Sequence, residues 1–267
     1  MHKENAYNRD QGANLCVSWH DLEYTIDSKS SFNKIQQEKV LSKRKKRQIL
    51  YEQSGYVESG EVLIVMGSSG SGKTSFLDCI CGRFSYQGQV LLNKSINITQ
   101  DNFGSFGAYV TQDDILYASM TCLETLKFAG KLKLGLDDKK TEKKAEEIIY
   151  QLGLDQCKNT LVGNQLIRGM SGGEKKRTAI GVELIGNPSV LLLDEPTSGL
   201  DSFNALKVVK ILNKQARMGK TIISTIHQPS SASFANFDRL MLLVEGRCIY
   251  QDKASKATRY FEQLGYM

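Results

Sequence analysis

The sequence predicts an α/β fold with a largely parallel sheet, and two observations predict it. Short, continuous apolar runs recur along the chain, as is typical of strands buried on both faces. Helical patterns lie between these runs, and an alternation of strands and helices favours a parallel sheet. The predicted strands are residues 62–66, 89–92, 108–111, 190–193, 221–226 and 240–244.

The helices are predicted from caps and periodicity. Residues 75–81 follow a glycine-rich loop and have a helical pattern. Thr121 and Glu124 form a capping box, and Thr141 is the predicted start of a second helix. We expect these two helices to belong to a helical subdomain over about residues 113–186. A later helix, between the strands at 190 and 221, places apolar residues on one face at i, i+3, i+4, i+7 and i+11. These residues are Ala205, Val208, Val209, Leu212 and Ala216.

Composition is that of an ordinary globular domain. The chain has 267 residues, of which 40% are apolar and 24% charged, enough to bury a core without disulfides. Its longest apolar runs have five residues, whereas a membrane-spanning helix needs about 20. We therefore expect no membrane span and no secretory signal in this sequence. Six cysteines without a Cys-x-x-Cys pair indicate a reducing compartment, hence the cytosol.

The first part of the chain is more polar. Residues 1–14 are predicted to be a disordered tail, 15–26 a strand, and 27–48 an exposed basic insertion. Lys+Arg minus Asp+Glu is 35 − 29 = +6, and much of the excess lies at residues 43–47. Such a run can bind nucleic acid, anionic lipid or an importin, but a solvated loop is the simpler interpretation.

A phosphate-binding loop is predicted at residues 67–74, named here the P-loop. It fits G-x-x-x-x-G-K-[ST] between a buried strand and a helix. Its glycines let backbone N–H groups wrap phosphates, and the helix N-terminus adds positive charge. Lys73 is expected to reach the β/γ-phosphates of a nucleotide, and Thr74 to supply a hydroxyl to Mg²⁺. The loop reads Gly67-Ser68-Ser69-Gly70-Ser71-Gly72-Lys73-Thr74.

Polar residues follow three other predicted strands. Asp194 and Glu195 come directly after an apolar run, so we expect Asp194 to hold Mg²⁺ through water and Glu195 to orient or deprotonate the attacking water. His227 follows the strand at 221–226, and a contact with the γ-phosphate is expected. Gln112 follows the strand at 108–111 and is a candidate for metal or water, although a polar strand-end residue without such a role fits the spacing equally well.

A second anion-binding helix start is predicted at residues 171–174. Ser171 is the expected N-cap, Glu174 closes a capping box, and Gly172 and Gly173 leave backbone N–H groups open. An ordinary well-capped helix explains the pattern too. One protein seldom needs two such helix starts for one triphosphate. The exception is a pair of chains that share two nucleotides between them.

These motifs, in this order, resemble those of ATP-binding cassette (ABC) domains from about residue 15 to the end of the sequence. The P-loop resembles Walker A, Gln112 the Q-loop, and residues 190–195 Walker B. Residues 170–174 resemble the signature loop, 198–201 the D-loop, and His227 the switch histidine. The resemblance implies a P-loop NTPase (RecA-like) core with a largely parallel sheet, an antiparallel β part near the N-terminus and an inserted helical subdomain.

Finer details resemble the G (White-type) half-transporters. They are IRGMSGGEKKR at 167–177, TIHQPS at 225–230, QDD at 112–114, FDRL at 237–240 and YFEQLGY at 260–266. The signature loop ends in Glu174 where most ABC proteins have Gln, although Glu is usual in this subfamily. The residue that stacks on adenine in many cassettes corresponds to Tyr24, or by spacing to Ile26, so adenine stacking is expected to be weak or absent.

The resemblance implies an ATPase that uses ATP and Mg²⁺. It would dimerise head to tail with a second nucleotide-binding domain, as a homodimer or heterodimer. Transport of a lipid, sterol, pigment or xenobiotic would go through membrane helices on the same full-length polypeptide, with this soluble part at the cytosolic face of a membrane. No nucleic acid partner is expected. Two alternatives remain: a soluble ABC ATPase acting on nucleic acid or the ribosome, and a regulatory nucleotide-binding module with low turnover.

Overall fold

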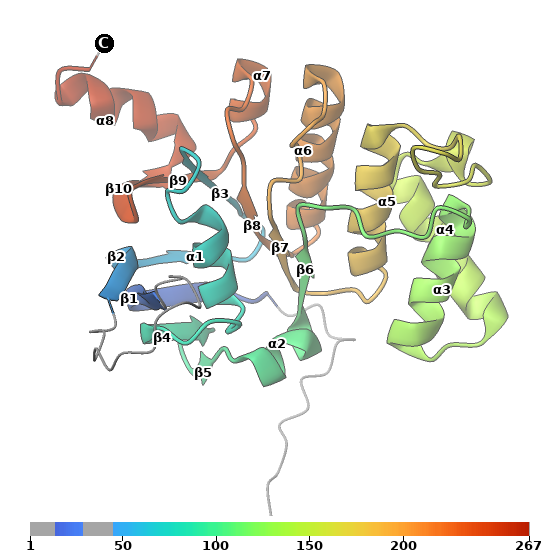
Figure 1. Ribbon diagram of the computed structural model, residues 1–267, viewed down its shortest axis with the longest axis horizontal. Helices are drawn as coiled ribbons and strands as arrows, with labels where there is room; N and C mark the ends of the chain where they lie inside the picture. The colour runs from blue at the N-terminus through green and yellow to red at the C-terminus, as the bar shows by residue number, and fades with distance from the viewer. Residues whose placement is uncertain (1–13, 29–44, 267) are drawn as a thin grey trace, which may run out of the picture.

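The computed structural model describes residues 14–28 and 45–266, and its strands form two sheets (Figure 1). The larger sheet has six strands in the order β10-β9-β3-β8-β7-β6. Neighbours pair in parallel from β9 through β6, and only β10 runs antiparallel to its neighbour β9. The predicted largely parallel sheet is confirmed. Its strands are β3 (Val62–Gly67), β6 (Gly107–Val110), β7 (Val190–Leu193), β8 (Thr221–Thr225), β9 (Arg239–Val244) and β10 (Arg247–Lys253).

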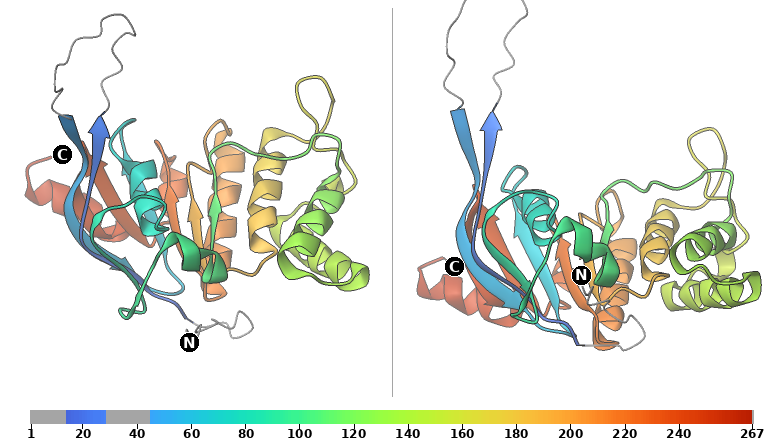
Figure 2. Two further views of the ribbon diagram at one scale, coloured as in Figure 1. Left: turned by 60° about the horizontal axis from the view of Figure 1, so that its bottom comes forward. Right: turned by 90° about the horizontal axis from the view of Figure 1, so that it is seen from below.

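The smaller sheet is antiparallel and contains the N-terminal strands, as expected. Its order is β2-β1-β4-β5. The predicted strand at 89–92 belongs to this sheet as part of β4, not to the parallel one. Figure 2 shows β1 and β2 running together as a long, curved ribbon along one side of the molecule. The strands are β1 (Val17–Ser28), β2 (Lys45–Val57), β4 (Gln87–Leu92) and β5 (Ile96–Asn97).

The structure corrects two boundaries near the N-terminus. The predicted insertion at 27–48 is shorter, because residues 27–28 end β1 and residues 45–48 begin β2, where residues 45–48 pair with residues 25–28. Its remainder, and the predicted tail except for Asn14, lie outside the described residues. Part of the basic run at 43–47 is therefore strand, held by backbone hydrogen bonds to β1. Ladder pairing of this kind overrides the polar character of the segment.

Helices cover both faces of the parallel sheet or extend beyond its β6 edge. The helical part predicted at 113–186 is present as α3, α4 and α5 (Figure 1). The second of these helices begins at Asp138 and is capped by Asp137, whose carboxylate accepts from Lys140 N–H, so the predicted start at Thr141 is wrong. The helices are α1 (Lys73–Ile80), α2 (Gln100–Phe106), α3 (Cys122–Leu134), α4 (Asp138–Leu152), α5 (Gly172–Leu184), α6 (Ser202–Arg217), α7 (Ser231–Phe234) and α8 (Ala257–Gln263), with 3-10 turns at Asp155–Cys157 and Ala254–Lys256.

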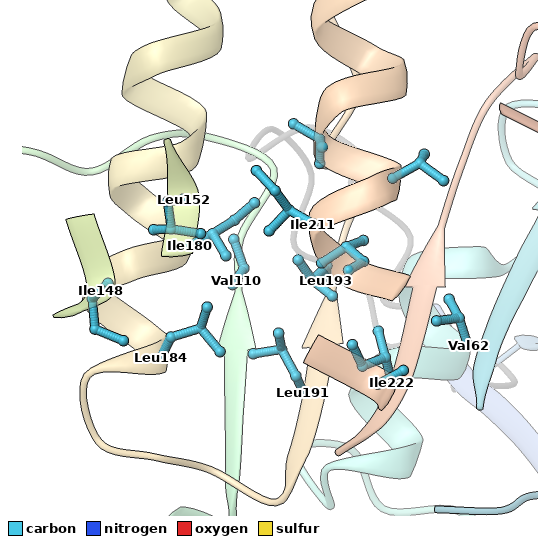
Figure 3. Packing of buried hydrophobic residues seen from close by; sticks show 14 of the residues in the cluster. Val62, Val110, Ile148, Leu152, Ile180, Leu184, Leu191, Leu193, Ile211 and Ile222 are labelled. Atoms are coloured by element: carbon cyan, nitrogen blue, oxygen red, sulfur yellow. The ribbon is translucent and has the colours of Figure 1, made fainter. Parts of the chain in front are cut away.

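Two hydrophobic clusters hold these layers together. One joins the sheet to α6 and to the helical part, and Figure 3 shows Leu191 and Leu193 of β7 in the same layer as Ile180 and Leu184 of α5. The other fills the space between the parallel sheet, α1 and the antiparallel sheet, around the fully buried Trp19. Since both faces of β7 are covered, the four-residue apolar run that predicts it is explained.

Candidate functional site

The parallel strands bring the predicted site residues to one edge of the sheet. The P-loop follows β3, Gln112 follows β6, Asp194 and Glu195 follow β7, and His227 follows β8. These four strands are neighbours or near neighbours in the order β3-β8-β7-β6. In open α/β sheets ligands bind outside the carboxyl ends of the strands, which is this edge.

The P-loop needs its glycines for conformation and for space. Gly70 and Gly72 have φ values of +77° and +101°, a region that side chains with a Cβ disfavour. A Cβ at Gly67 would lie 2.3 Å from the backbone oxygen of Leu243. Gly72 is the N-cap of α1, and no side chain caps this helix. The first N–H groups of α1 are therefore left for an anion.

Lys73 is held inside the P-loop. Its side chain is 5% exposed, and its ammonium donates to the carbonyl oxygens of Gly67 (3.1 Å) and Ser68 (3.0 Å). The same nitrogen lies 3.8 Å from Oε1 of Glu195. A buried ammonium needs such partners, because burial of an unpaired charge is costly. These contacts orient the lysine toward the space enclosed by the loop.

Asp194 and Glu195 are fixed by a residue that the sequence did not single out. The Thr225 hydroxyl donates to Oδ1 of the buried Asp194 (2.6 Å) and accepts from the backbone N–H of Glu195 (2.7 Å). Glu195 has a φ of +45°, which is uncommon for a residue with a side chain. The signal for Thr225 is a hydroxyl at the end of a buried apolar strand, where it requires a partner.

Gln112 reaches the same group. Its side-chain amide donates to Oε2 of Glu195 (3.3 Å). Gln112, Glu195 and Lys73 thus form one set of contacts across the carboxyl ends of β6, β7 and β3. A cavity of about 450 Å³ adjoins them, lined by Arg47, Ile49, Ser69, Gly70, Gly72, Lys73, Thr74, Ser75, Gln112 and Glu195.

Tyr24 does not line this cavity. Its ring stacks on Phe84, with centroids 5.0 Å apart and an interplanar angle of 12°. That packing turns the tyrosine toward the core between the sheets and away from the cavity. The side chains that β2 contributes instead are Arg47 and Ile49. Arg47 was missed because the sequence placed the basic run at 43–47 in a loop, and no sequence pattern singled out Ile49. Ile26, the alternative position, is the ladder partner of Arg47 and is 41% exposed.

His227 lines a second cavity, of about 290 Å³, which Glu195 also lines. Glu195 is common to both cavities, so the predicted glutamate and histidine lie at one connected site. The second cavity also takes in the loop between β7 and α6, which sequence analysis identified as resembling the D-loop. Its lining comprises Glu195, Thr197, Ser198, Gly199, Leu200, Ser202, Ala205, Val209, Ile226, His227, Gln228, Pro229, Ser230 and Ser233.

The signature loop, residues 170–174, has the predicted capping box. The Ser171 hydroxyl accepts from Glu174 N–H (3.4 Å), and Oε2 of Glu174 accepts from the Ser171 N–H and hydroxyl (2.8 Å each). Partial burial opposes ionisation of Glu174, but these hydrogen bonds outweigh it and lower the pKa of the carboxyl. Gly173 is required for packing, since a Cβ there would lie 2.8 Å from the Asn204 side chain of α6.

The signature loop does not join the P-loop of the same chain. Among the hydrogen bonds and ion pairs of residues 14–28 and 45–266, none connects residues 171–174 with residues 67–74. Figures 1 and 2 show α5 far from α1, with α6 and the strands β7 and β8 between them. The two predicted anion sites are therefore separate surfaces of one chain.

The residues present suit Mg²⁺ bound together with a nucleotide. No group of three or more His, Cys, Asp or Glu side chains in the described part of the chain is arranged to hold a metal alone. The site offers one buried carboxylate, Asp194, and one exposed hydroxyl, Thr74, beside the open N-terminus of α1. Magnesium commonly uses one or two protein oxygens together with substrate phosphates and water, so this donor set fits.

No helix among the described residues meets the length and apolarity needed to span a bilayer.

Comparison with known proteins gives consistent matches. The model of the ABC transporter family matches residues 50–198, which include the P-loop, Gln112, the signature loop and Glu195. Curated relatives include ABC transporter G family member 22 of Arabidopsis thaliana, 44% identical over 233 residues, and G family member 1 of Dictyostelium discoideum, 44% identical over 234 residues. These alignments cover 85% and 86% of the chain but 31% and 30% of the relatives. G family member 6 of Arabidopsis thaliana is 35% identical over 271 residues, with 96% of the chain and 37% of the relative covered. The chain spans about a third of the length of these relatives.

Proposed function

The chain belongs to the ABC transporter family and is an ATP-binding cassette of its G subfamily, and from this premise we propose that it hydrolyses ATP to drive transport by a half-transporter. One observation carries the proposal: Lys73 and Gln112 both contact Glu195 beside an uncapped helix N-terminus. Phosphoryl transfer depends mainly on positioning and charge stabilisation, and this arrangement provides both.

Each residue has a role that its geometry supports. Backbone N–H groups of the P-loop donate to the phosphate oxygens, and the Lys73 ammonium neutralises charge on the phosphates as it exchanges loop carbonyls for phosphate oxygens. Glu195 orients the attacking water or takes its proton while the bond to the leaving ADP breaks. Gln112, which already donates to Glu195, holds this carboxylate or the water in place. His227 contacts the γ-phosphate from the second cavity.

Mg²⁺ would be held by the Thr74 hydroxyl and, through water, by Asp194, and it supplies charge neutralisation at the phosphates. The hydrogen bond from Thr225 already fixes Asp194 in one orientation. That hydroxyl also accepts from Glu195 N–H, so the same threonine holds the Asp194 carboxylate and the backbone of Glu195.

The separation of the signature loop from the P-loop supports a two-chain site. Gly172 is exposed at the start of α5, and the Ser171 backbone and side chain are exposed with it. We propose that this surface covers the nucleotide on the P-loop of a second cassette, identical or related, in a head-to-tail dimer with two ATP molecules. ATP then bridges the two chains, and hydrolysis releases them.

We propose transport as the process that ATP hydrolysis drives, because the relatives are named as ABC transporter G family members. Opening and closing of the dimer would move membrane helices on the same full-length polypeptide, with this cassette on the cytosolic face. The cargo would be a lipid, sterol, pigment or xenobiotic. No nucleic acid partner is invoked, because the site residues account for nucleotide binding.

The substitution Glu195→Gln tests the hydrolytic role. It keeps the size and hydrogen-bonding capacity of the side chain but removes the carboxylate, so turnover should fall by about 100- to 10,000-fold. ATP binding should persist, and the chain should accumulate as an ATP-dependent dimer in size-exclusion chromatography with light scattering. Undiminished phosphate release would refute the role given to Glu195.

A second substitution separates dimerisation from nucleotide binding. Ser171→Arg, added to Glu195→Gln, places a bulky cation on the exposed signature loop. Binding of a fluorescent ATP analogue by the single chain should be unchanged, whereas the ATP-dependent dimer should be lost. Persistence of the dimer would place its interface elsewhere.

A further inference from the structure

A buried lysine on α5 connects the signature helix to the segment that follows β6. Lys176 is 3% exposed overall, and its ammonium donates to the backbone oxygen of Gln112 at 2.7 Å. The same nitrogen forms an ion pair with Oδ1 of Asp114, also at 2.7 Å. A lysine so deeply buried is rare unless it is paired, and here both partners lie in one short segment, residues 112–114.

This lysine continues the contacts of the nucleotide site. Lys73 lies 3.8 Å from Glu195, Glu195 accepts from the Gln112 side chain at 3.3 Å, and the Gln112 backbone accepts from Lys176 at 2.7 Å. The path therefore runs from the P-loop through Gln112 to α5. In the described part of the chain, the hydrogen bonds and ion pairs between residues 111–116 and α5 all come from Lys176.

The far end of the path is the signature loop. Ser171 is the N-cap of α5, and Lys176 lies within the second turn of this helix. A backbone hydrogen bond from Lys175 N–H to Ser171 O and a hydrogen bond from the Thr178 side-chain hydroxyl to Glu174 O hold these first turns together. Lys176 and Ser171 are therefore joined by helical backbone, without a loop between them.

We propose that Lys176 is a positioning residue that couples the chain's own nucleotide site to the signature loop it presents to a partner chain. Entry of a γ-phosphate changes the contacts of Lys73 and Glu195, Gln112 follows Glu195, and the lysine carries this shift to α5. The inference rests on the proposed dimeric function and adds a mechanism for cooperation between its two sites. Coupling of this kind is energetic linkage between sites, of a size that changes affinity by about 5- to 150-fold.

The test is Lys176→Met, which removes the ammonium and keeps the length of the side chain. Binding of a fluorescent ATP analogue to the single chain should change less than about twofold. In the Glu195→Gln background, ATP-dependent dimerisation should weaken by about 10-fold, and in the hydrolysing chain the Hill coefficient for ATP should fall toward one. If Lys176 only stabilised the fold, Lys176→Met would lower the Tm but leave the Hill coefficient for ATP unchanged.

Lys175→Met is the matched control. It removes the same charge from the next position of α5, where the ammonium donates to the Gly163 carbonyl instead of to residues 112–114. We expect its Hill coefficient to remain that of the unmodified chain. If both variants lose cooperativity alike, charge on the helix is responsible and the assignment to Lys176 fails.

Asp114→Asn provides a second route should Lys176→Met be poorly folded. Asp114 is only partly buried, so this change should leave the fold intact while weakening the link. The double variant should lose no more cooperativity than Lys176→Met alone, because both act in one contact. Normal cooperativity in Asp114→Asn and Lys176→Met, with wild-type hydrolysis and dimerisation present, overturns this inference but not the proposed function. If the unmodified chain did not hydrolyse ATP at all, the proposed function would be overturned instead.

Discussion

The molecule has two helix N-termini at its predicted anion sites, and they are built in opposite ways. At α1, the N-cap is Gly72 in a left-handed conformation, and no side chain caps the helix. At α5, Ser171 and Glu174 satisfy each other in a complete capping box. The first end is open and has a buried ammonium beside it, whereas the second is closed by its own side chains.

This difference matches the two roles proposed for them. An open N-terminus with an adjacent lysine is preorganised to bind phosphates without help, since no side-chain cap has to leave the first N–H groups of α1. A capped N-terminus keeps α5 stable when no partner chain is present, and any anion must compete with the Glu174 carboxylate for the Ser171 hydroxyl. The P-loop is expected to set affinity for ATP, and the signature loop to respond to ATP already bound elsewhere.

The largest effect on the contrast between the two helix N-termini is expected at Lys73. Lys73→Ala removes the ammonium beside the open helix end, and kcat/KM for ATP should fall by about 100- to 1,000-fold. Binding of a fluorescent ATP analogue should weaken in parallel. The fold should survive, because within residues 14–28 and 45–266 the side-chain hydrogen bonds and ion pair of this lysine go to P-loop carbonyls and Glu195, both at the site itself. Retention of ATP binding would mean that the backbone N–H groups suffice.

A matched pair of glycine substitutions sharpens the contrast. Gly72→Ala places a Cβ at φ +101° and 2.7 Å from a Leu50 methyl, so it should cost about 1–3 kcal/mol of stability and weaken ATP binding. At Gly172 φ is not positive, and a Cβ would lie 3.8 Å from a Leu200 methyl, an ordinary contact. Gly172→Ala should change stability by less than about 0.5 kcal/mol. Denaturant titration of both variants checks this, and equal losses would contradict it.

The smallest effect is expected at the capped N-terminus of α5, where the contribution of Glu174 to stability should depend on pH. The pKa of Glu174 is lowered in the folded state. Its carboxylate therefore contributes stability above the unfolded pKa of about 4.3, and this contribution is lost as pH falls through the folded value. The difference in Tm between wild type and Glu174→Gln should be largest near neutral pH and shrink between about pH 5 and pH 3.

Glu124→Gln is the control for that measurement. Glu124 closes the capping box of α3, and its pKa is lowered through hydrogen bonds from the Thr121 backbone and hydroxyl. The pH dependence of its Tm should be similar, but ATP-dependent dimerisation should be unaffected. A Tm difference at Glu174 that does not vary with pH would show that the carboxylate charge contributes nothing.

Local sequence was sufficient wherever a few adjacent residues decide the structure. The P-loop spacing, the capping boxes at Thr121 and Ser171, and the apolar run of β7 each predict their element correctly, because backbone sterics and capping act within one turn or one strand. Strand-end placement also put Glu195 and Gln112 at one edge of the sheet, since parallel strands share a carboxyl edge, but their direct contact was not predicted. The start of α4 was missed because Asp137 and Thr141 are both plausible caps.

Only the tertiary structure decided which distant residues became partners. Thr225 bonds both Asp194 and Glu195, Lys176 reaches Gln112, and Tyr24 stacks on Phe84 away from the cavity. The sequence by itself determined that this protein has a phosphate loop, two carboxylates and a capped second helix, because those features depend on neighbours along the chain. Their connection into one site was decided by sheet order and helix packing, which place polar groups of residues 64 or 83 positions apart within hydrogen-bond distance.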